Sequence, residues 1–305
     1  MTFAILDFGT NTFNLLIARR NERSFTILHT SKQPVKLGKG GIQSNRLTPD
    51  AFERGFVAIH NHMETIRDYD VDEIRAFATS AIRNASNGQD FVEEVWKRFG
   101  FRVRVIPGDR EAELIFKGVR QAVPLGEEKS MILDIGGGSN EFIICSREGI
   151  HWKQSFEIGM ARVLELFRVS DPIAIEEIRA VESWFRQALQ PLFEAVRKER
   201  PSVLIGASGS FDTFAALIAH QKQLPPEDGQ GHRIDLDDFG QLYKKLLRST
   251  LEERRRMPGM EPVRVEMIVV AAIFVSFVLR ECGIHQLAHS HYALKEGVIA
   301  ELVGL

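Results

Sequence analysis

The fold is decided at residues 131–144, which read MILDIGGGSNEFII. The apolar residues on both sides of the glycines predict two buried strands joined by a tight turn. Three consecutive glycines at 136–138 let the backbone approach a ligand closely and turn its N–H groups toward it. One acid, Asp134, stands at the entrance of the turn, and another, Glu141, stands at its exit. Such a turn suits phosphate oxygens, and the two acids add a place for a metal ion and a candidate base.

The same pattern occurs near the start of the chain. Residues 7–17, DFGTNTFNLLI, align without a gap on residues 134–144, DIGGGSNEFII. An acid, a glycine and a hydroxyl fall in register, and both copies run into an apolar strand. The repeat predicts a duplicated fold in which the two turns face each other across a cleft. Asn14 stands where the second copy has Glu141, so the two copies differ in charge at that position.

Predicted strands alternate with predicted helices along the chain, which indicates an α/β protein. The polar segment 124–129 is the expected linker between a first domain at 1–125 and a second at 126–305, whose last helix could pack back on the first domain. Residues 223–233 form a predicted surface loop. The predicted strands are 3–6, 15–18, 24–29, 33–37, 73–78, 102–106, 131–135, 142–144, 151–158, 203–207 and 286–290, and the predicted helices are 48–68, 88–99, 110–121, 173–198 with a break at Pro191, 211–220, 237–250 and 267–279.

Composition limits the classes of function. The chain has 305 residues, 44% hydrophobic and 26% charged, with a formal net charge of −2. This charge gives no general attraction to nucleic acid or to an anionic membrane, so neither is an expected partner. The two cysteines are in no metal-binding or disulfide spacing. The start of the chain does not resemble a signal peptide, and the apolar run at 267–279 is too short to span a bilayer, so we expect a cytoplasmic protein.

Three turns that combine glycines with hydroxyl residues follow predicted strands, at 9–11, 136–139 and 206–210. One such turn is often purely structural, but three turns together with the duplication predict a phosphate-binding cleft. The expected phosphate-binding residues, with a strand-end arginine added, are Gly9, Thr10, Asn11, Arg83, Gly136, Gly137, Gly138, Ser139, Gly209 and Ser210.

Four carboxylates are candidates for chemistry. Asp7 and Asp134 end strands just before a turn, where they either cap the turn or hold Mg²⁺, the latter together with Glu141. Glu111 follows Pro107-Gly108 in the first turn of a helix, where the helix N-terminus also stabilises a carboxylate. Glu141 could instead be a solvated residue at a strand start. Together, Glu111 and Glu141 could hold a water between them and a terminal phosphoryl group, and we expect both to be catalytic.

Basic residues could balance the charge of a polyanion. We expect Lys36, Arg255 and Arg264 to contact it, although an arginine run such as 254–256 is more often a solvated helix face. The histidine pairs His60/His62 and His289/His291 have no thiol or acidic partner at metal-ligand spacing nearby in the sequence. We therefore do not expect either pair to bind a metal.

Several segments jointly resemble the exopolyphosphatase / guanosine pentaphosphate phosphohydrolase family, in its short two-domain form, of the actin-like ATPase superfamily. The resemblance extends over nearly the whole chain. The segments that carry it are 7–12 (DFGTNT), 35–40 (VKLGKG), 78–85 (ATSAIRNA), 108–114 (GDREAEL), 133–141 (LDIGGGSNE), 206–210 (GASGS) and 257–259 (MPG). The resemblance implies two actin-like, ribonuclease H-like α/β domains with a duplicated mixed β-sheet core and an interdomain cleft. We also expect a homodimer.

The resemblance also implies roles for particular residues. Glu111 would be the catalytic carboxylate, Glu141 would assist the water or the metal, and Asp134 would help to bind Mg²⁺. Phosphate contacts would come from Asn11, Arg83, Gly137, Gly138 and Ser139. The chain departs from the usual family pattern at four positions, Arg110, Glu113, Asn140 and Ser210. These departures bear on the choice of substrate more than on the type of reaction.

The leading hypothesis is a Mg²⁺-dependent phosphohydrolase that releases terminal orthophosphate from inorganic polyphosphate. Guanosine pentaphosphate is the alternative substrate. The other hypotheses are an ATP-dependent kinase or ATPase of the same superfamily, and a non-catalytic regulator that binds the alarmone or polyphosphate. ATP binding without polyphosphate turnover would favour the kinase or ATPase, and tight binding without turnover would favour the regulator.

Overall fold

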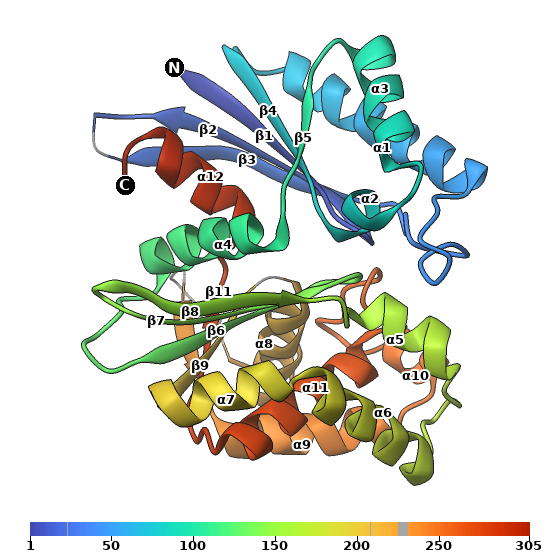
Figure 1. The fold of residues 1–305 in the computed structure, drawn as a ribbon, viewed down its shortest axis with the longest axis vertical. Coiled ribbons are helices and arrows are strands. Elements are labelled where there is room, and N and C mark those ends of the chain that lie inside the picture. The colour runs from blue at the N-terminus through green and yellow to red at the C-terminus, as the bar shows by residue number, and fades with distance from the viewer. Residues whose placement is uncertain (23, 208, 225–230) are drawn as a thin grey trace.

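The computed structural model describes residues 1–22, 24–207, 209–224 and 231–305. Two mixed β-sheets form the two halves of the molecule, one above the other in Figure 1. Ser208, in the third predicted turn, and residues 225–230, in the predicted loop at 223–233, lie outside the described residues. The architecture is the predicted α/β fold with two actin-like halves.

The first sheet has the strand order β3-β2-β1-β4-β5, and the second has the order β10-β11-β9-β6-β7-β8. The strands are β1 (Thr2–Phe8), β2 (Thr12–Arg20), β3 (Phe25–Pro34), β4 (Glu73–Ala78), β5 (Val103–Val105), β6 (Ser130–Ile135), β7 (Asn140–Ser146), β8 (Gly149–Phe156), β9 (Val203–Ala207), β10 (Gly231–Ile234) and β11 (Leu287–Ser290).

The predicted duplication is confirmed by the strand register. In the β1–β2 hairpin Asp7 lies opposite Asn14, and in the β6–β7 hairpin Asp134 lies opposite Glu141. The turns close in the same way, because the Gly9 N–H donates to the Thr12 carbonyl at 3.0 Å and the Gly136 N–H donates to the Ser139 carbonyl at 3.1 Å. In each half the first strand of the hairpin also pairs in parallel with a later strand, β4 or β9.

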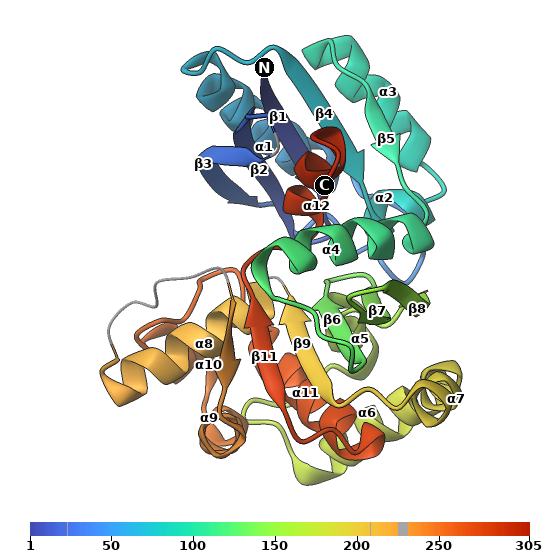
Figure 2. The same ribbon diagram turned by 90° about the vertical axis from the view of Figure 1, so that its left-hand side faces the viewer.

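Most helices cover the outer faces of the two sheets (Figures 1 and 2). The helices are α1 (Pro49–Arg67), α2 (Ser80–Asn84), α3 (Gly88–Phe99), α4 (Gly108–Ala122), α5 (Met160–Phe167), α6 (Ile175–Ala188), α7 (Gln190–Glu199), α8 (Gly209–Lys222), α9 (Leu236–Arg248), α10 (Leu251–Arg255), α11 (Ile268–Cys282) and α12 (Leu294–Leu302). Among the described residues, none of these helices is both long enough and apolar enough to cross a membrane.

Helices α4 and α12 lie between the two sheets (Figure 1). Helix α12 contacts β1 and β2, and α4 contacts β7 and β8, so a shared apolar layer joins the halves. The two helices approach closely at Gly118 and Gly297. A Cβ at Gly297 would lie 1.7 Å from the Leu114 carbonyl oxygen, and one at Gly118 would lie 1.9 Å from the Ala293 carbonyl oxygen. This contact fixes the position of the first turn of α4, which carries Glu111.

Local sequence signals account for most of the element boundaries. The side chain of Thr48 caps α1 by accepting a hydrogen bond from the Ala51 N–H at 3.2 Å, as Thr48 followed by Pro49 predicts. The predicted helix at 173–198 breaks before Pro191 into α6 and α7. Two predictions were wrong. Residues 231–233 of the predicted loop belong to strand β10, which pairs with β11, and the predicted strands at 24–29 and 33–37 are parts of one strand, β3, which ends at Pro34. The nine-residue strand β2 offers a continuous partner, and residues 30–32 pair with it.

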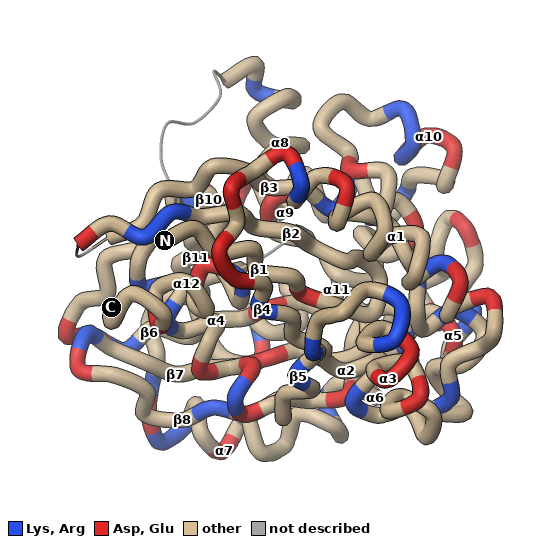
Figure 3. Tube along the Cα trace, turned by 90° about the horizontal axis from the view of Figure 1, so that it is seen from above, with Lys and Arg blue, Asp and Glu red and all other residues tan. Residues whose placement is uncertain are grey.

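Charged residues of both signs alternate over the whole trace (Figure 3). This distribution agrees with the net charge of −2. Both cysteines are free thiols, and Cys145 is fully buried, where burial raises its pKa to about 12.

Candidate active site

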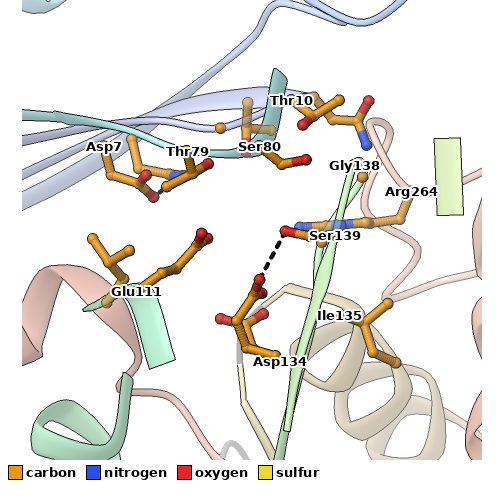
Figure 4. A pocket seen from close by; sticks show the side chains of 18 residues that line it. Asp7, Thr10, Thr79, Ser80, Glu111, Asp134, Ile135, Gly138, Ser139 and Arg264 are labelled. Carbon is orange, nitrogen blue, oxygen red and sulfur yellow. Dashed lines mark hydrogen bonds between the residues drawn. The ribbon is translucent and has the colours of Figure 1, made fainter. Parts of the chain in front are cut away.

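A small cavity of about 80 Å³ lies where the two glycine turns meet. Figure 4 shows Asp7, Thr10 and Ser80 on one side of it and Asp134, Gly138 and Ser139 on the other. The lining residues come from the β1–β2 and β6–β7 hairpins, α4, the α2 N-terminus and two other segments: Asp7, Gly9, Thr10, Asn11, Thr12, Asn14, Thr79, Ser80, Glu111, Asp134, Ile135, Gly136, Gly137, Gly138, Ser139, Glu141, Arg264 and Leu294. The structure therefore brings most of the predicted site residues together.

The turns of the two halves are in direct contact. A Cβ at Gly137 would lie 2.1 Å from the Asn11 Nδ2, and one at Gly138 would lie 2.5 Å from the Ser80 Oγ and 2.7 Å from the Thr10 Oγ1. No side chain fits at either position without movement of the opposite half. The glycines are needed here for close approach across the cleft.

Glu111 enters the cavity from the first turn of α4. Glu111 is 7% exposed, and the Arg83 Nη1 donates a hydrogen bond to the Glu111 Oε2 at 2.7 Å. Burial raises the pKa of Glu111 well above its usual value, and the nearby charge of Glu141 raises it further. The Arg83 guanidinium acts against both effects. A carboxylate in this environment holds a proton more readily than one in water, as a group that must exchange protons near neutral pH requires.

Glu141 lies at the start of β7 and is 2% exposed. Ser139 and Ser155 donate hydrogen bonds from their Oγ atoms to the same carboxylate oxygen, Oε1, at 2.7 and 2.6 Å. Burial raises the pKa of Glu141 to about 7, although the two serine hydroxyls lower it. The serines therefore fix the orientation of this carboxylate and leave its second oxygen without a hydrogen bond from either of them.

Asp7 and Asp134, which are partly buried, complete a group of four carboxylates. The Asn14 Nδ2 donates to Asp7 Oδ2 at 2.9 Å. Burial raises the pKa of both aspartates, and the charges of Glu141 and Asp7 raise that of Asp134 further. Four carboxylates that repel one another in a buried space, supported by amide and hydroxyl oxygens, form a donor set that fits a hard divalent cation. A bound cation would lower the electrostatic cost of this arrangement.

Arg83 is positioned by two carboxylates. Besides Glu111, its Nη2 donates to the Glu157 Oε1 at 3.0 Å. Glu157 also accepts a hydrogen bond from the Ser80 Oγ at 2.7 Å and lies 3.5 Å from the Arg162 guanidinium, so it links the first half to the second. Arg83 borders the site through Glu111 and is not among the residues that line the cavity.

A second, larger cavity of about 530 Å³ adjoins the first and shares Asp7, Thr12, Asn14, Asp134 and Arg264 with it. Arg264 lies between the two cavities, with its guanidinium against Gly209 at the start of α8. Residues that sequence reasoning did not single out also line one of the cavities, namely Thr79, Ser80 and Lys295. Thr79 and Ser80 directly follow the predicted strand at 73–78, whereas nothing in the sequence around Lys295 marks it.

Some predicted contacts lie elsewhere. Lys36 forms an ion pair with Glu266 at 2.8 Å, and Arg255 forms one with Glu252 at 3.3 Å. Ser210 is buried within the first turn of α8. None of these three residues is among the described residues that line either cavity.

Three residues that depart from the family pattern, Arg110, Glu113 and Asn140, make their contacts outside the cavity. Arg110 donates to Glu113 at 3.0 Å and pairs with Glu301 of α12, and Lys153 of β8 pairs with Glu113. These ion pairs hold α4 between its two neighbours. The Asn140 Nδ2 donates to the Ile158 carbonyl at 3.0 Å, so this residue anchors the start of β7.

The fold gives one histidine pair a partner that lies far away in the sequence. His289 and His291 do have an acidic partner, because Asp212 Oδ1 lies 2.8 Å from the His289 Nε2 and 2.9 Å from the His291 Nδ1. His232 lies beside them. The sequence could not reveal this group, since its members come from α8, β10, β11 and the residue after β11. In the other pair, the His62 Nε2 lies 3.0 Å from the Phe13 carbonyl oxygen, and His60 is exposed with its Nε2 4.0 Å from the Glu64 carboxylate.

The chain was compared with known families and solved structures. The Ppx/GppA phosphatase family matches residues 16–305. An exopolyphosphatase from Cytophaga hutchinsonii is 38% identical, with 99% of this chain and 98% of that chain covered and a TM-score of 0.96. An exopolyphosphatase-like protein is 27% identical, with 99% and 97% covered and a TM-score of 0.89. A Ppx/GppA family member from Aquifex aeolicus, 24% identical with 99% and 97% covered and a TM-score of 0.80, shares the fold. The chain therefore belongs to the Ppx/GppA phosphatase family.

Proposed function

We propose that this chain is an exopolyphosphatase-type phosphohydrolase that releases terminal orthophosphate from inorganic polyphosphate. One observation carries the proposal. Two buried carboxylates, Glu111 from the first half and Glu141 from the second, line one cavity between two glycine turns. Membership of a phosphatase family and 38% identity to a solved exopolyphosphatase support the same conclusion.

The cofactor in this proposal is Mg²⁺. The all-oxygen donor set fits this ion, and Asp7, Asp134 and Glu141 would hold it. When bound, Mg²⁺ supplies positive charge that neutralises phosphate oxygens in the transition state.

The chain's own residues accept the proton, position the water and bind the phosphate oxygens. Glu111 accepts a proton from the attacking water, and the neighbouring Arg83 guanidinium keeps this carboxylate oriented. Glu141, fixed by its two serines, positions the water from the opposite side. The Gly136 N–H closes its turn and the Ser139 hydroxyl donates to Glu141, so the backbone N–H groups of Gly137, Gly138 and Ser139 bind the phosphate oxygens. Thr10 and Asn11 face them from the other turn.

Guanosine pentaphosphate is the second candidate substrate. The observation that favours it is the 530 Å³ cavity next to the glycine turns, whose lining includes Ile27 and Tyr292 as well as cationic side chains. Cavities of about 300–1,000 Å³ accommodate small organic ligands, so a nucleoside attached to a phosphate chain has room here. Linear polyphosphate has no group that needs this apolar lining.

A phosphate-release assay distinguishes these substrates. Long-chain polyphosphate, tripolyphosphate, guanosine pentaphosphate and ATP are compared with and without Mg²⁺. The proposal predicts Mg²⁺-dependent release from polyphosphate with the highest kcat/KM. Faster turnover of guanosine pentaphosphate would establish the second candidate, and turnover of ATP alone would refute both. Light scattering on the same sample tests the expected homodimer.

A further inference from the structure

Three histidines from separate segments meet at one end of the second sheet. His232 on β10 lies directly opposite His289 on β11, and His291 follows β11 after one residue. Each can offer one ring nitrogen such that all three atoms lie within 4.8 Å of one another. Together with Asp212 of α8, they are called the histidine cluster below. None of its four residues takes part in the hydrolytic chemistry proposed above.

Asp212 joins the cluster through a single oxygen. Its Oδ1 lies 2.8 Å from the His289 Nε2 and 2.9 Å from the His291 Nδ1. His289 is fully buried, and its Nδ1 has no hydrogen-bond partner in the part of the chain that the structure describes. The other ring nitrogen of His289, Nε2, is the atom that faces Asp212 and is available to the cluster.

The distances suit a shared ion. With metal–ligand bonds of about 2.1 Å, neighbouring ligand atoms are separated by about 3.0 Å in octahedral and about 3.4 Å in tetrahedral geometry. The distances from Asp212 Oδ1 to the His289 Nε2 and the His291 Nδ1 are slightly shorter than these ligand–ligand distances. A small outward shift of the three side chains therefore makes room for an ion between these atoms. His291 has a side chain that is 42% exposed and can rotate to complete the set with His232.

We propose that His232, His289, His291 and Asp212 form a binding site for a divalent transition-metal ion, such as Zn²⁺ or Co²⁺. Three imidazoles and one carboxylate are the donors that these ions prefer, whereas Mg²⁺ prefers oxygen donors alone. The site is therefore chemically distinct from the carboxylate site between the glycine turns. Both kinds of ion can bind at once, because the two sites share no ligand.

The protonation state of the cluster agrees with metal binding. Burial and the neighbouring His289 and His291 lower the pKa of His232 to about 4, so its imidazole is neutral at pH 7, as a metal ligand must be. Burial raises the pKa of Asp212, but the hydrogen bonds from His289 and His291 outweigh it and hold this pKa below its usual range. The carboxylate therefore stays charged.

The position of the cluster suggests what the ion does. Asp212 and His291 line the 530 Å³ cavity, which extends to Asp7 and Asp134 of the candidate active site. A bound ion adds a positive charge at the Asp212 end of this cavity, besides Lys295 and Arg264. It could accept an anionic group of a ligand whose terminal phosphate lies between the glycine turns.

Metal titration tests the proposal without relying on activity. Protein stripped with EDTA is titrated with Co²⁺ and followed by visible absorption, then with Zn²⁺ by calorimetry in excess Mg²⁺. The proposal predicts one saturable site per chain, with d–d absorption bands for Co²⁺ and little competition from Mg²⁺. Asp212→Asn and His291→Ala should each weaken Zn²⁺ binding at least about 100-fold.

The matched control is His60→Ala, which removes an exposed histidine near the Glu64 carboxylate on α1 and should leave Zn²⁺ affinity unchanged. His291 is exposed, so its variant should fold, and circular dichroism of the metal-free proteins checks that it does. The absence of a saturable site in wild-type protein would overturn the proposal. Equal Zn²⁺ affinity in wild type and both folded cluster variants would do the same.

Discussion

Replacing Gly138 with alanine tests whether the two glycine turns meet during catalysis as they do in this structure. The new Cβ would lie 2.5 Å from the Ser80 Oγ and 2.7 Å from the Thr10 Oγ1. Ser80 cannot move away freely, since its Oγ donates to Glu157 at 2.7 Å and accepts from Asn84 at 3.2 Å. The halves must therefore separate, or the hydroxyls must lose their hydrogen bonds.

The expected magnitude follows from the cost of overpacking. An extra methyl group at a close-packed contact costs about 1–3 kcal/mol. If this cost falls on the closed state that carries out the reaction, kcat/KM for phosphate release falls about 5- to 150-fold. The free energy of unfolding should change less than this, because open halves avoid the contact.

The assay is a double-mutant cycle with Gly138→Ala, Ser80→Ala and the combined variant. Removing the Ser80 hydroxyl relieves the shortest contact, so the combined variant should be more active than the sum of the two single effects predicts. Gly240→Ala is the control, because a Cβ at Gly240 in α9 meets no atom within 4 Å. Full activity of Gly138→Ala, or strict additivity with Ser80→Ala, would refute the idea that the turns touch in the active state.

Three further results are expected. At fixed saturating Mg²⁺, kcat/KM should rise as the pH increases above the usual titration range of a glutamate, because Glu111, whose pKa burial raises well above its usual value, must lose its proton before it can accept one from water; a flat profile would contradict this. In EDTA, the folded state binds more protons at Glu141 than the unfolded state between about pH 4.5 and 7, so the contribution of Glu141 to the free energy of unfolding falls as the pH rises. Urea titrations at several pH values should show that the free energy of unfolding decreases less with pH in Glu141→Gln than in the wild type. Gly297→Ala should lower the free energy of unfolding by about 1–3 kcal/mol, since the new Cβ would lie 1.7 Å from the Leu114 carbonyl oxygen. An unchanged urea midpoint would contradict this and show that α12 shifts away from α4 at little cost in free energy.

The sequence predicts the parts of this protein that depend on local patterns. The repeated acid, glycine and hydroxyl residues specify two equivalent hairpins, and the strand register confirms that Asp7 corresponds to Asp134 and Asn14 to Glu141. Apolar periodicity and proline placement give most helices to within a few residues. Strands β3 and β10 are exceptions, because each depends on its partner strand, β2 or β11, and not on its own residues.

Interactions between distant segments could not be predicted in this way. Ser155 orients Glu141 from a neighbouring strand, and Glu157 connects Ser80 and Arg83 with Arg162. The histidine cluster combines side chains whose separation in the sequence carries no metal-binding pattern. The histidine cluster follows from the order of strands in the second sheet, where β11 lies between β10 and β9. Figure 2 shows β11 beside β9.

The carboxylate pair itself is tested most directly by phosphate release from polyphosphate by Glu111→Gln. The measurement uses saturating substrate and Mg²⁺, with circular dichroism to establish that the variant is folded. Glutamine keeps the shape of the side chain and can still contact Arg83, but it cannot accept a proton from water. The kcat of this variant should fall at least about 100-fold, the lower range for loss of a general base. A folded variant with wild-type kcat would contradict the role of Glu111.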